Sequence, residues 1–243
     1  MELTQRQLQI LKTIIDEYIE TAEPVGSDTL DKKYNLGISP ATIRNEMVKL
    51  TTAGFLKQPH TSAGRTPTPV ALKLYVDKLM QTKELSLTDE VKVKQKIWDY
   101  RSKMNNLLRE ATRTLAQQTK TMSLAATDEG DMYTGGVGNI LEMPEFYDID
   151  ITRHLLATLD EYDYWWNIFS RVSGFDKDDL MILLGEDLGR QFLDQCGGVF
   201  VSFSSPSHKG AIGVIGPNRL DYPRIIPTVR YIGNLIGEIA KSW

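Results

Sequence analysis

The opening residues of the chain repeat apolar positions with the period of an α-helix. These apolar residues are Leu8, Leu11, Ile14, Ile15 and Ile19. Thr4 stands just before the pattern, and Gln7 lies three residues after Thr4, which is the spacing of a capping box. The pattern therefore predicts a helix from Thr4 to about Ala22.

Two shorter helices are predicted after the sequence EPVGS ends the first one. Ser27 stands where it would cap the segment SDTLDKKYN, and LGI then forms a tight turn. Ser39 and Pro40 begin the third helix, with serine at the N-cap and proline at the first helical position. The buried stripe of this third helix is predicted to be Ile43, Met47 and Leu50.

A polar segment, QPHTSAGRTPT at residues 58–68, follows the third helix and cannot bury itself in a core. It contains two prolines and no large apolar side chain. Gly54 ends the helix before it, and GFLKQ is predicted to be extended. Three helices followed by two strands around a protruding tip are typical of a helix-turn-helix unit with a wing. We therefore predict a winged-helix DNA-binding domain over residues 1–80.

The next region is predicted to contain a polar linker, residues 81–90, and one long helix from Thr88 to about Met122. Its apolar residues follow a heptad spacing and are Val93, Ile97, Tyr100, Met104, Leu107 and Ala111. A seam of this length indicates a partner surface, either for a second copy of the chain or for the C-terminal domain.

The remainder, within residues 91–243, mixes predicted helices and strands. Residues 126–148 are loop-rich, 151–172 are helical, and 178–188 form a strand that leads into a loop. Two β-rich runs, Val199–Ser204 and Ala211–Ile215, predict a hairpin, and Tyr222–Lys241 predicts a final helix. The fold class is therefore α+β and helix-rich, with a long helix after the linker.

Composition is that of a soluble globular protein: 41% of the 243 residues are apolar and 25% are charged. No stretch approaches the roughly 20 apolar residues of a membrane-spanning helix. The one cysteine, Cys196, fits a reducing compartment, so we expect a cytoplasmic protein without a membrane partner. Net charge is −4, yet residues 28–73 hold seven basic and three acidic side chains, a local charge of +4.

The polar face of the third helix carries the first candidate DNA contacts. Arginine bonds guanine and asparagine bonds adenine in bidentate pairs, so Arg44 and Asn45 are predicted to read bases in the major groove, with Lys49 beside them. Ser39 and Thr42 stand at the helix start, where hydroxyl and N–H groups bind phosphate. The alternative is a solvated helix face with no ligand.

The predicted wing carries the second set of candidate DNA contacts. Arg65 is the candidate for a narrow minor groove, whose negative potential favours a guanidinium. The residues expected to hold phosphates are His60, Thr61, Ser62 and Thr66. The alternative is a mobile surface hairpin.

Catalytic, metal and cofactor sites are not expected. The glycine-rich TGGVGNI lacks the Lys-Ser/Thr of a phosphate loop, and the three histidines have no ligand spacing. The acids Asp160, Glu161 and Asp163 fit a solvated face better than an acid/base pair. An enzyme or small-molecule sensor therefore has little support.

Three motifs, YIETAEPVGS, SPATIRNEM and QPHTSAGRTPT, together resemble the N-terminal domain of HrcA, the bacterial heat-inducible transcription repressor family. The similarity returns in GGVGNILEMPEF and GAIGVIGPNRLDYPRIIPTVRYIGNLIGE and covers most of the chain. It implies a winged helix, a GAF-like domain, an inserted dimerising segment and no cofactor. By position, it assigns DNA reading to Ser39, Thr42, Arg44 and Asn45, with His60 and Arg65 in the wing.

The resemblance further implies a homodimer that binds double-stranded DNA at an inverted-repeat operator, CIRCE, and represses chaperone genes until heat relieves it. In that family, the GroEL chaperonin is a partner that keeps the repressor active. Family members have a longer middle region, so we expect the GAF-like domain here to be reduced to a hairpin plus helices. The alternative function is a winged-helix protein-interaction module that does not bind DNA.

Overall fold

A computed structural model describes residues 3–34, 36–60, 63–98, 104–172, 180–204 and 208–240. Contacts divide the chain into two compact units, Met1–Gln81 and Thr82–Trp243, which we describe separately. Within the described ranges, no helix combines the length and apolar character that crossing a membrane requires.

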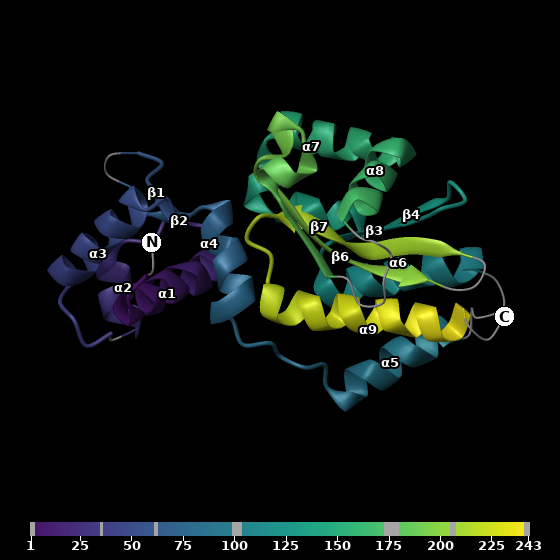
Figure 1. Ribbon diagram of the computed structural model, residues 1–243, viewed down its shortest axis with the longest axis horizontal. Coiled ribbons are helices and arrows are strands. Elements are labelled where there is room, and N and C mark those ends of the chain that lie inside the picture. Colours follow the sequence, from purple (N-terminus) through teal and green to yellow (C-terminus); the bar gives the residue numbers. More distant parts are fainter. Residues whose placement is uncertain are drawn as a thin grey trace. The chain divides into compact units, whose positions relative to one another are not determined.

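The first unit begins with three helices: α1 (Gln5–Thr21), α2 (Ser27–Tyr34) and α3 (Pro40–Thr52) (Figure 1). The predicted capping box of α1 is confirmed, because the Thr4 hydroxyl and the Gln7 amide each bond the other residue's backbone N–H. The predicted cap of α3 is also confirmed, with Ser39 at the N-cap and Pro40 behind it. α2 begins at Ser27 itself.

The periodic apolar residues of these helices meet in one core. Its fully buried members are Leu11, Ile14, Ile15, Leu30, Ile43 and Leu50. Burial of a Leu or Ile side chain stabilises a fold by about 1.5–3 kcal/mol, so this core holds α3 in its orientation.

A short antiparallel hairpin follows α3. Strand β1 (Leu56–Lys57) pairs with β2 (Thr66–Pro67), so that Leu56 lies opposite Pro67. Helix α4 (Pro69–Leu74) and a π-helical turn, Tyr75–Leu79, complete the unit. The Tyr75 hydroxyl donates to Asp16 Oδ1 at 2.6 Å and ties this turn to α1.

The second unit is built around a sheet that has five strands among the described residues, in the order β4-β3-β7-β6-β5, with every neighbouring pair antiparallel. The strands are β3 (Met122–Thr127), β4 (Met132–Gly135), β5 (Leu180–Leu184), β6 (Cys196–Ser204) and β7 (Lys209–Pro217). The predicted C-terminal hairpin and the strand before it are confirmed as β6, β7 and β5.

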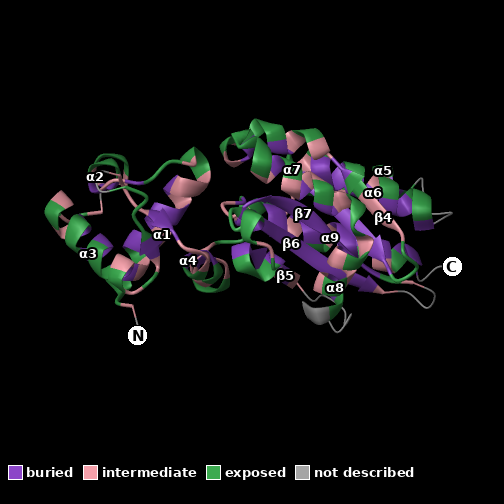
Figure 2. Cartoon of the chain, turned by 90° about the horizontal axis from the view of Figure 1, so that it is seen from above, coloured by how far each residue is buried: buried purple, intermediate pink, exposed green. Residues whose placement is uncertain are grey.

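Helices cover both faces of this sheet (Figure 1). Helices α6 (Met104–Thr119) and α9 (Tyr222–Ala240) pack on one face, and α5 (Leu87–Trp98) lies outside them. Helices α7 (Ile149–Ala157) and α8 (Tyr162–Val172) cover the other face. Buried residues therefore concentrate in the central strands, as Figure 2 shows. The α+β, helix-rich class is confirmed.

Two expectations for this unit are wrong. Strand β3 begins where the long helix was predicted to end and reaches only the start of the predicted loop-rich region, whereas β4 lies inside that region, so the sheet is larger than a hairpin plus helices. The single helix predicted from Thr88 to Met122 is instead two helices that pack side by side, with Lys96 Nζ on α5 donating to Gln117 Oε1 on α6 at 2.9 Å. Tyr100 lies outside the described residues. The other seam residues are buried within the unit: Val93, Ile97, Met104, Leu107 and Ala111.

A heptad spacing cannot distinguish one long helix from a helical hairpin, since both bury the same stripe. The predicted helix over 151–172 is likewise divided into α7 and α8 by a 3₁₀ turn at Thr158–Asp160. The final predicted helix is confirmed as far as Ala240.

Candidate nucleic-acid interface

Helix α3 presents a largely polar face to solvent because the apolar residues Ile43, Met47 and Leu50 point the other way. Ile43 and Leu50 are fully buried, whereas Arg44, Asn45 and Lys49 are exposed. Arg44 and Asn45 make no side-chain hydrogen bond or ion pair with the residues that the structure describes. Both side chains therefore keep their donors for an external ligand.

The polar groups at the start of α3 already make some hydrogen bonds to one another. Ser39 Oγ accepts a hydrogen bond from the Thr42 N–H at 3.2 Å, and it lies 2.9 Å from Thr42 Oγ1. Ser39 is exposed and Thr42 is half-buried, so both hydroxyls still reach the surface.

The buried carboxylate of Glu46 fixes α3 against α1. Gln7 Nε2 donates to one carboxylate oxygen at 3.1 Å, and Lys49 Nζ donates to the other at 2.9 Å. The hydrogen bond from Lys49, more than that from Gln7, lowers the pKa of Glu46 against the opposing effect of burial. Part of the positive charge of Lys49 is therefore balanced by Glu46 within the unit.

The base of the hairpin is pinned to the connection between α1 and α2. The Val25 and Arg65 backbones exchange two hydrogen bonds, of 2.9 and 2.8 Å. Gly64 lies against the same backbone, and a Cβ at this position would stand 2.4 Å from the Val25 carbonyl carbon. Only glycine fits this approach, which explains why Gly64 stands in the polar segment.

The guanidinium of Arg65 points back toward α3. Its Nε donates to Thr51 Oγ1 at 3.2 Å, and one terminal nitrogen donates to the Ala63 carbonyl at 3.4 Å. Both acceptors are uncharged, so the positive charge of Arg65 is not neutralised by them. The side chain is thus held at the hairpin base, and its predicted minor-groove contact stays a prediction.

A surface depression of about 510 Å³ brings these elements together. Arg44 and Val48 of α3 line one side of it, and Gln58 and Arg65 of the hairpin line the other. Asp28 at the start of α2 also lies on its wall. The arrangement places two guanidinium groups from different elements beside one exposed helix face.

Comparison with known proteins gives the family. The family described as HrcA protein C terminal domain matches residues 72–226, more than half of the chain. This chain belongs to the HrcA family. Two relatives named "Heat-inducible transcription repressor HrcA", a name that denotes a non-enzymatic role, extend the similarity over the first unit.

The relative from Ruminiclostridium cellulolyticum is 28% identical and the alignment covers 98% of this chain and 97% of the relative. The one from Clostridioides difficile is also 28% identical, with 98% and 100% covered. The first alignment runs over 340 positions, more than the 243 residues of this HrcA-family chain, so part of the relative has no counterpart here. A solved structure, "Crystal structure of a hypothetical protein at 2.2 A resolution", shares the fold, with a TM-score of 0.80, 20% identity and 99% of each chain covered.

The other residues predicted to contact DNA in this HrcA-family chain differ in their exposure to solvent. His60 is exposed in the hairpin loop, where its carbonyl accepts from the Ala63 N–H at 2.9 Å. Thr61 and Ser62 lie outside the described residues. Thr66 is buried, and its hydroxyl has no hydrogen-bond partner among the described residues, so its predicted phosphate contact is wrong. A strand residue whose side chain faces inward cannot reach a groove.

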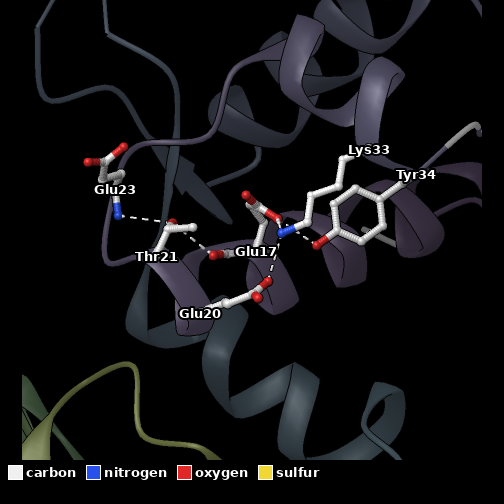
Figure 3. Close-up of polar contacts among 6 residues, drawn as sticks. All are labelled: Glu17, Glu20, Thr21, Glu23, Lys33 and Tyr34. Carbon is white, nitrogen blue, oxygen red and sulfur yellow. Dashed lines mark hydrogen bonds and ion pairs between the residues drawn. The ribbon is translucent and has the colours of Figure 1, made fainter.

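One basic residue of the positively charged segment, residues 28–73, makes ion pairs within the first unit. Lys33 Nζ lies 2.7 Å from Glu17 Oε2 and 2.7 Å from Glu20 Oε2 on α1, and the Tyr34 hydroxyl donates to the same Glu17 oxygen at 2.6 Å (Figure 3). The hydrogen bond from Lys33 is the main reason that the pKa of Glu17 is lowered, and burial raises the pKa of Tyr34 to about 12. Local charge counted from sequence therefore overstates what faces a ligand.

Sequence reasoning missed Val48. This side chain is 48% exposed, and it shares the outward ridge of α3 with other exposed residues at 4-3-4 spacing. The ridge consists of Ala41, Asn45, Val48 and Thr52. The signal was present, since a β-branched apolar residue stands where the helical pattern calls for a polar one.

Proposed function

We propose that this chain is a sequence-specific transcription repressor whose first unit is a winged helix that binds double-stranded DNA. The observation that carries the proposal is the exposed face of α3 with Arg44 and Asn45 unpaired among the described residues, next to a second guanidinium from the hairpin. A helix of this kind fits the major groove and reads bases from its first turns. Membership of the HrcA family and the printed names of the relatives agree with it.

The roles follow from side-chain chemistry. Arg44 bonds O6 and N7 of guanine, and Asn45 bonds N6 and N7 of adenine. Val48, which follows Arg44 and Asn45 by about one helical turn, contacts the C5-methyl group of thymine, which is the apolar feature of the major groove. Each good base contact is worth about 1–3 kcal/mol of discrimination.

Other groups hold the duplex without reading it. Ser39 and Thr42 at the start of α3, and His60 in the hairpin loop, contact phosphates. Arg65 adds positive charge at the edge of the depression and keeps the hairpin at a fixed distance from α3. Lys49 contributes less, because Glu46 shares its charge.

Repression requires two copies. A single short helix reads few base pairs, and a two-fold symmetric pair reads two half-sites of an inverted repeat. We infer a CIRCE-type operator upstream of chaperone genes, release on heating, and the GroEL chaperonin as a partner. These follow from the family resemblance. Release on heating fits a dimer whose folded population falls steeply as temperature rises.

A gel shift on a chaperone-promoter fragment with an inverted repeat tests the proposal. We expect binding that weakens steeply with salt, since released counterions supply much of the affinity. Arg44→Ala should reduce the preference for the inverted repeat over a scrambled duplex by about 10- to 100-fold. Arg113→Ala, which removes an exposed arginine on α6, should leave that preference unchanged. Salt-insensitive behaviour with no loss in Arg44→Ala would favour a protein-interaction module instead.

A further inference from the structure

A separate surface groove of about 680 Å³ runs along the first two turns of α1. We call it the α1 groove; it lies between residues 5–12, 36–38 and 78–79, all within the first unit. Its walls are therefore α1, the turn between α2 and α3, and the π-helical turn. It shares no lining residue with the depression between α3 and the hairpin. A partner in the α1 groove would therefore leave the proposed DNA contacts uncovered.

Apolar side chains that the core does not fully cover line the α1 groove. Leu8, Leu36, Ile38 and Leu79 are each half-buried, and they come from three different elements. Single exposed apolar residues are ordinary on a protein surface, whereas apolar surface that is gathered in one groove and rimmed by polar residues indicates a binding site.

The charged side chains that line the α1 groove are all basic among the residues that the structure describes: Arg6, Lys12 and Lys78. Lys12 Nζ already pairs with Asp16 Oδ2 at 2.5 Å. Arg6 and Lys78 are exposed, and neither makes an ion pair or a side-chain hydrogen bond within the described ranges. Positive charge beside apolar surface is complementary to a partner that combines acidic and apolar side chains.

The spread of the cations favours a helical segment over a small ligand. Arg6 and Lys12 are about 9 Å apart along the axis of α1, and Lys78 comes from a different element. One acidic head group suits one of these cations, whereas acids at intervals along a segment suit all of them. Small ligands are also buried over most of their surface, whereas the basic rim of this groove is exposed.

We propose that the α1 groove binds an amphipathic helix of another protein, with an apolar ridge against the half-buried leucines and isoleucine and with acidic residues beside Arg6 and Lys78. Helices bind apolar grooves in this way through residues at i, i+3, i+4 and i+7. The groove follows residues 5–12 of α1, a length of about 12 Å, so two to three turns of the partner helix fit along it.

Fluorescence anisotropy of a labelled synthetic peptide with the full chain, in the absence of DNA, tests the proposal. The acidic peptide carries leucine at the four ridge positions, glutamate on both flanks and alanine elsewhere. The lysine peptide is identical except that lysine replaces every glutamate. We expect the acidic peptide to bind with a dissociation constant of about 10–100 µM at low salt, and the lysine peptide to bind at least about tenfold more weakly.

Charge reversal in the groove provides the first set of variants. The double variant Arg6→Glu/Lys78→Glu should bind the acidic peptide about tenfold more weakly than the wild type and should bind the lysine peptide more tightly than the wild type does. Lys32→Glu, the same change at an exposed position on α2 outside the groove, is the matched control and should change neither affinity. Loss of folding cannot produce a reversed preference.

An apolar variant provides the second arm. Leu79→Ser should weaken binding of the acidic peptide by about fivefold, because it removes part of the apolar wall. Val70→Ser, at a 59% exposed position on α4 outside the groove, should leave that affinity unchanged. Unchanged circular dichroism would show that both variants are folded.

Three results would overturn the inference. They are no binding of the acidic peptide at about 1 mM, equal affinity of the wild type for the acidic and lysine peptides, and equal affinity of the wild type and the double variant for the acidic peptide. If the acidic peptide fails and sodium decanoate binds the wild type but not the double variant, the groove takes a small amphipathic anion instead. Because no DNA is present, failure here is separate from failure of the proposed DNA binding, which the gel shift measures.

Discussion

Arg44 of α3 and Arg65 of the hairpin line the same surface depression, although they belong to different elements. The core beneath α3 holds the backbone of the first in place, and two backbone hydrogen bonds to Val25 hold that of the second. DNA that entered this depression would therefore meet positive charges from two different elements.

Removal of a thymine methyl group should reveal the contact of Val48. Each thymine of the operator is replaced in turn by uracil. We expect one replacement per half-site to weaken wild-type binding by about fivefold, since a methyl contact is worth roughly 1 kcal/mol. Val48→Ala should bind more weakly overall and be insensitive to uracil at that position. If uracil scanning changes the two proteins equally at every position, Val48 does not read a methyl group.

Substitution of Gly64 should destabilise the first unit. A Cβ in Gly64→Ala would lie 2.4 Å from the Val25 backbone, so the hairpin must shift away at a cost of about 1–3 kcal/mol. Gly26→Ala is the matched control, because its Cβ meets nothing nearer than 3.8 Å. Chemical denaturation of both variants makes the comparison, and equal midpoints would show that the approach to Val25 is not tight.

The Glu17 carboxylate should make the first unit sensitive to acid. Its folded pKa lies below the ordinary value of 4.5, so its stabilisation is fully present above that pH and is lost as pH falls through the lowered pKa. Glu17→Gln should reduce the free energy of unfolding at pH 7 by about 1–3 kcal/mol, and the difference from wild type should shrink in more acidic solution.

Glu23→Gln, an exposed neighbour in Figure 3, is the control and should leave the unfolding free energy unchanged. Urea titrations across the pH series provide the measurement. A Glu17→Gln deficit that stays constant down to the most acidic point would contradict the account.

Local pattern predicted the first unit well because caps, turns and helical periodicity act over a few residues. The Thr4 and Ser39 caps and the buried stripe of α3 could all be read from sequence. The inward-facing Thr66 and the return of Arg65 toward Thr51 could not, since both depend on how the hairpin packs.

The second unit was harder to predict for the same reason. Strand β3 reads as a weak pattern, MSLAAT, and becomes a strand by pairing with β7, almost ninety positions further along the chain. The heptad seam marked the right buried residues, but it could not show that α5 and α6 are separate helices that pack against each other.

The most direct test of the central claim is the affinity of wild type, Arg44→Ala and Arg113→Ala for an inverted-repeat duplex and a scrambled one, measured over a salt series. The account predicts that Arg44→Ala loses about 10- to 100-fold in preference for the inverted repeat, while Arg113→Ala matches the wild type at every salt concentration. Equal affinity of the wild type for both duplexes, or an Arg44→Ala preference equal to that of the wild type, would contradict it.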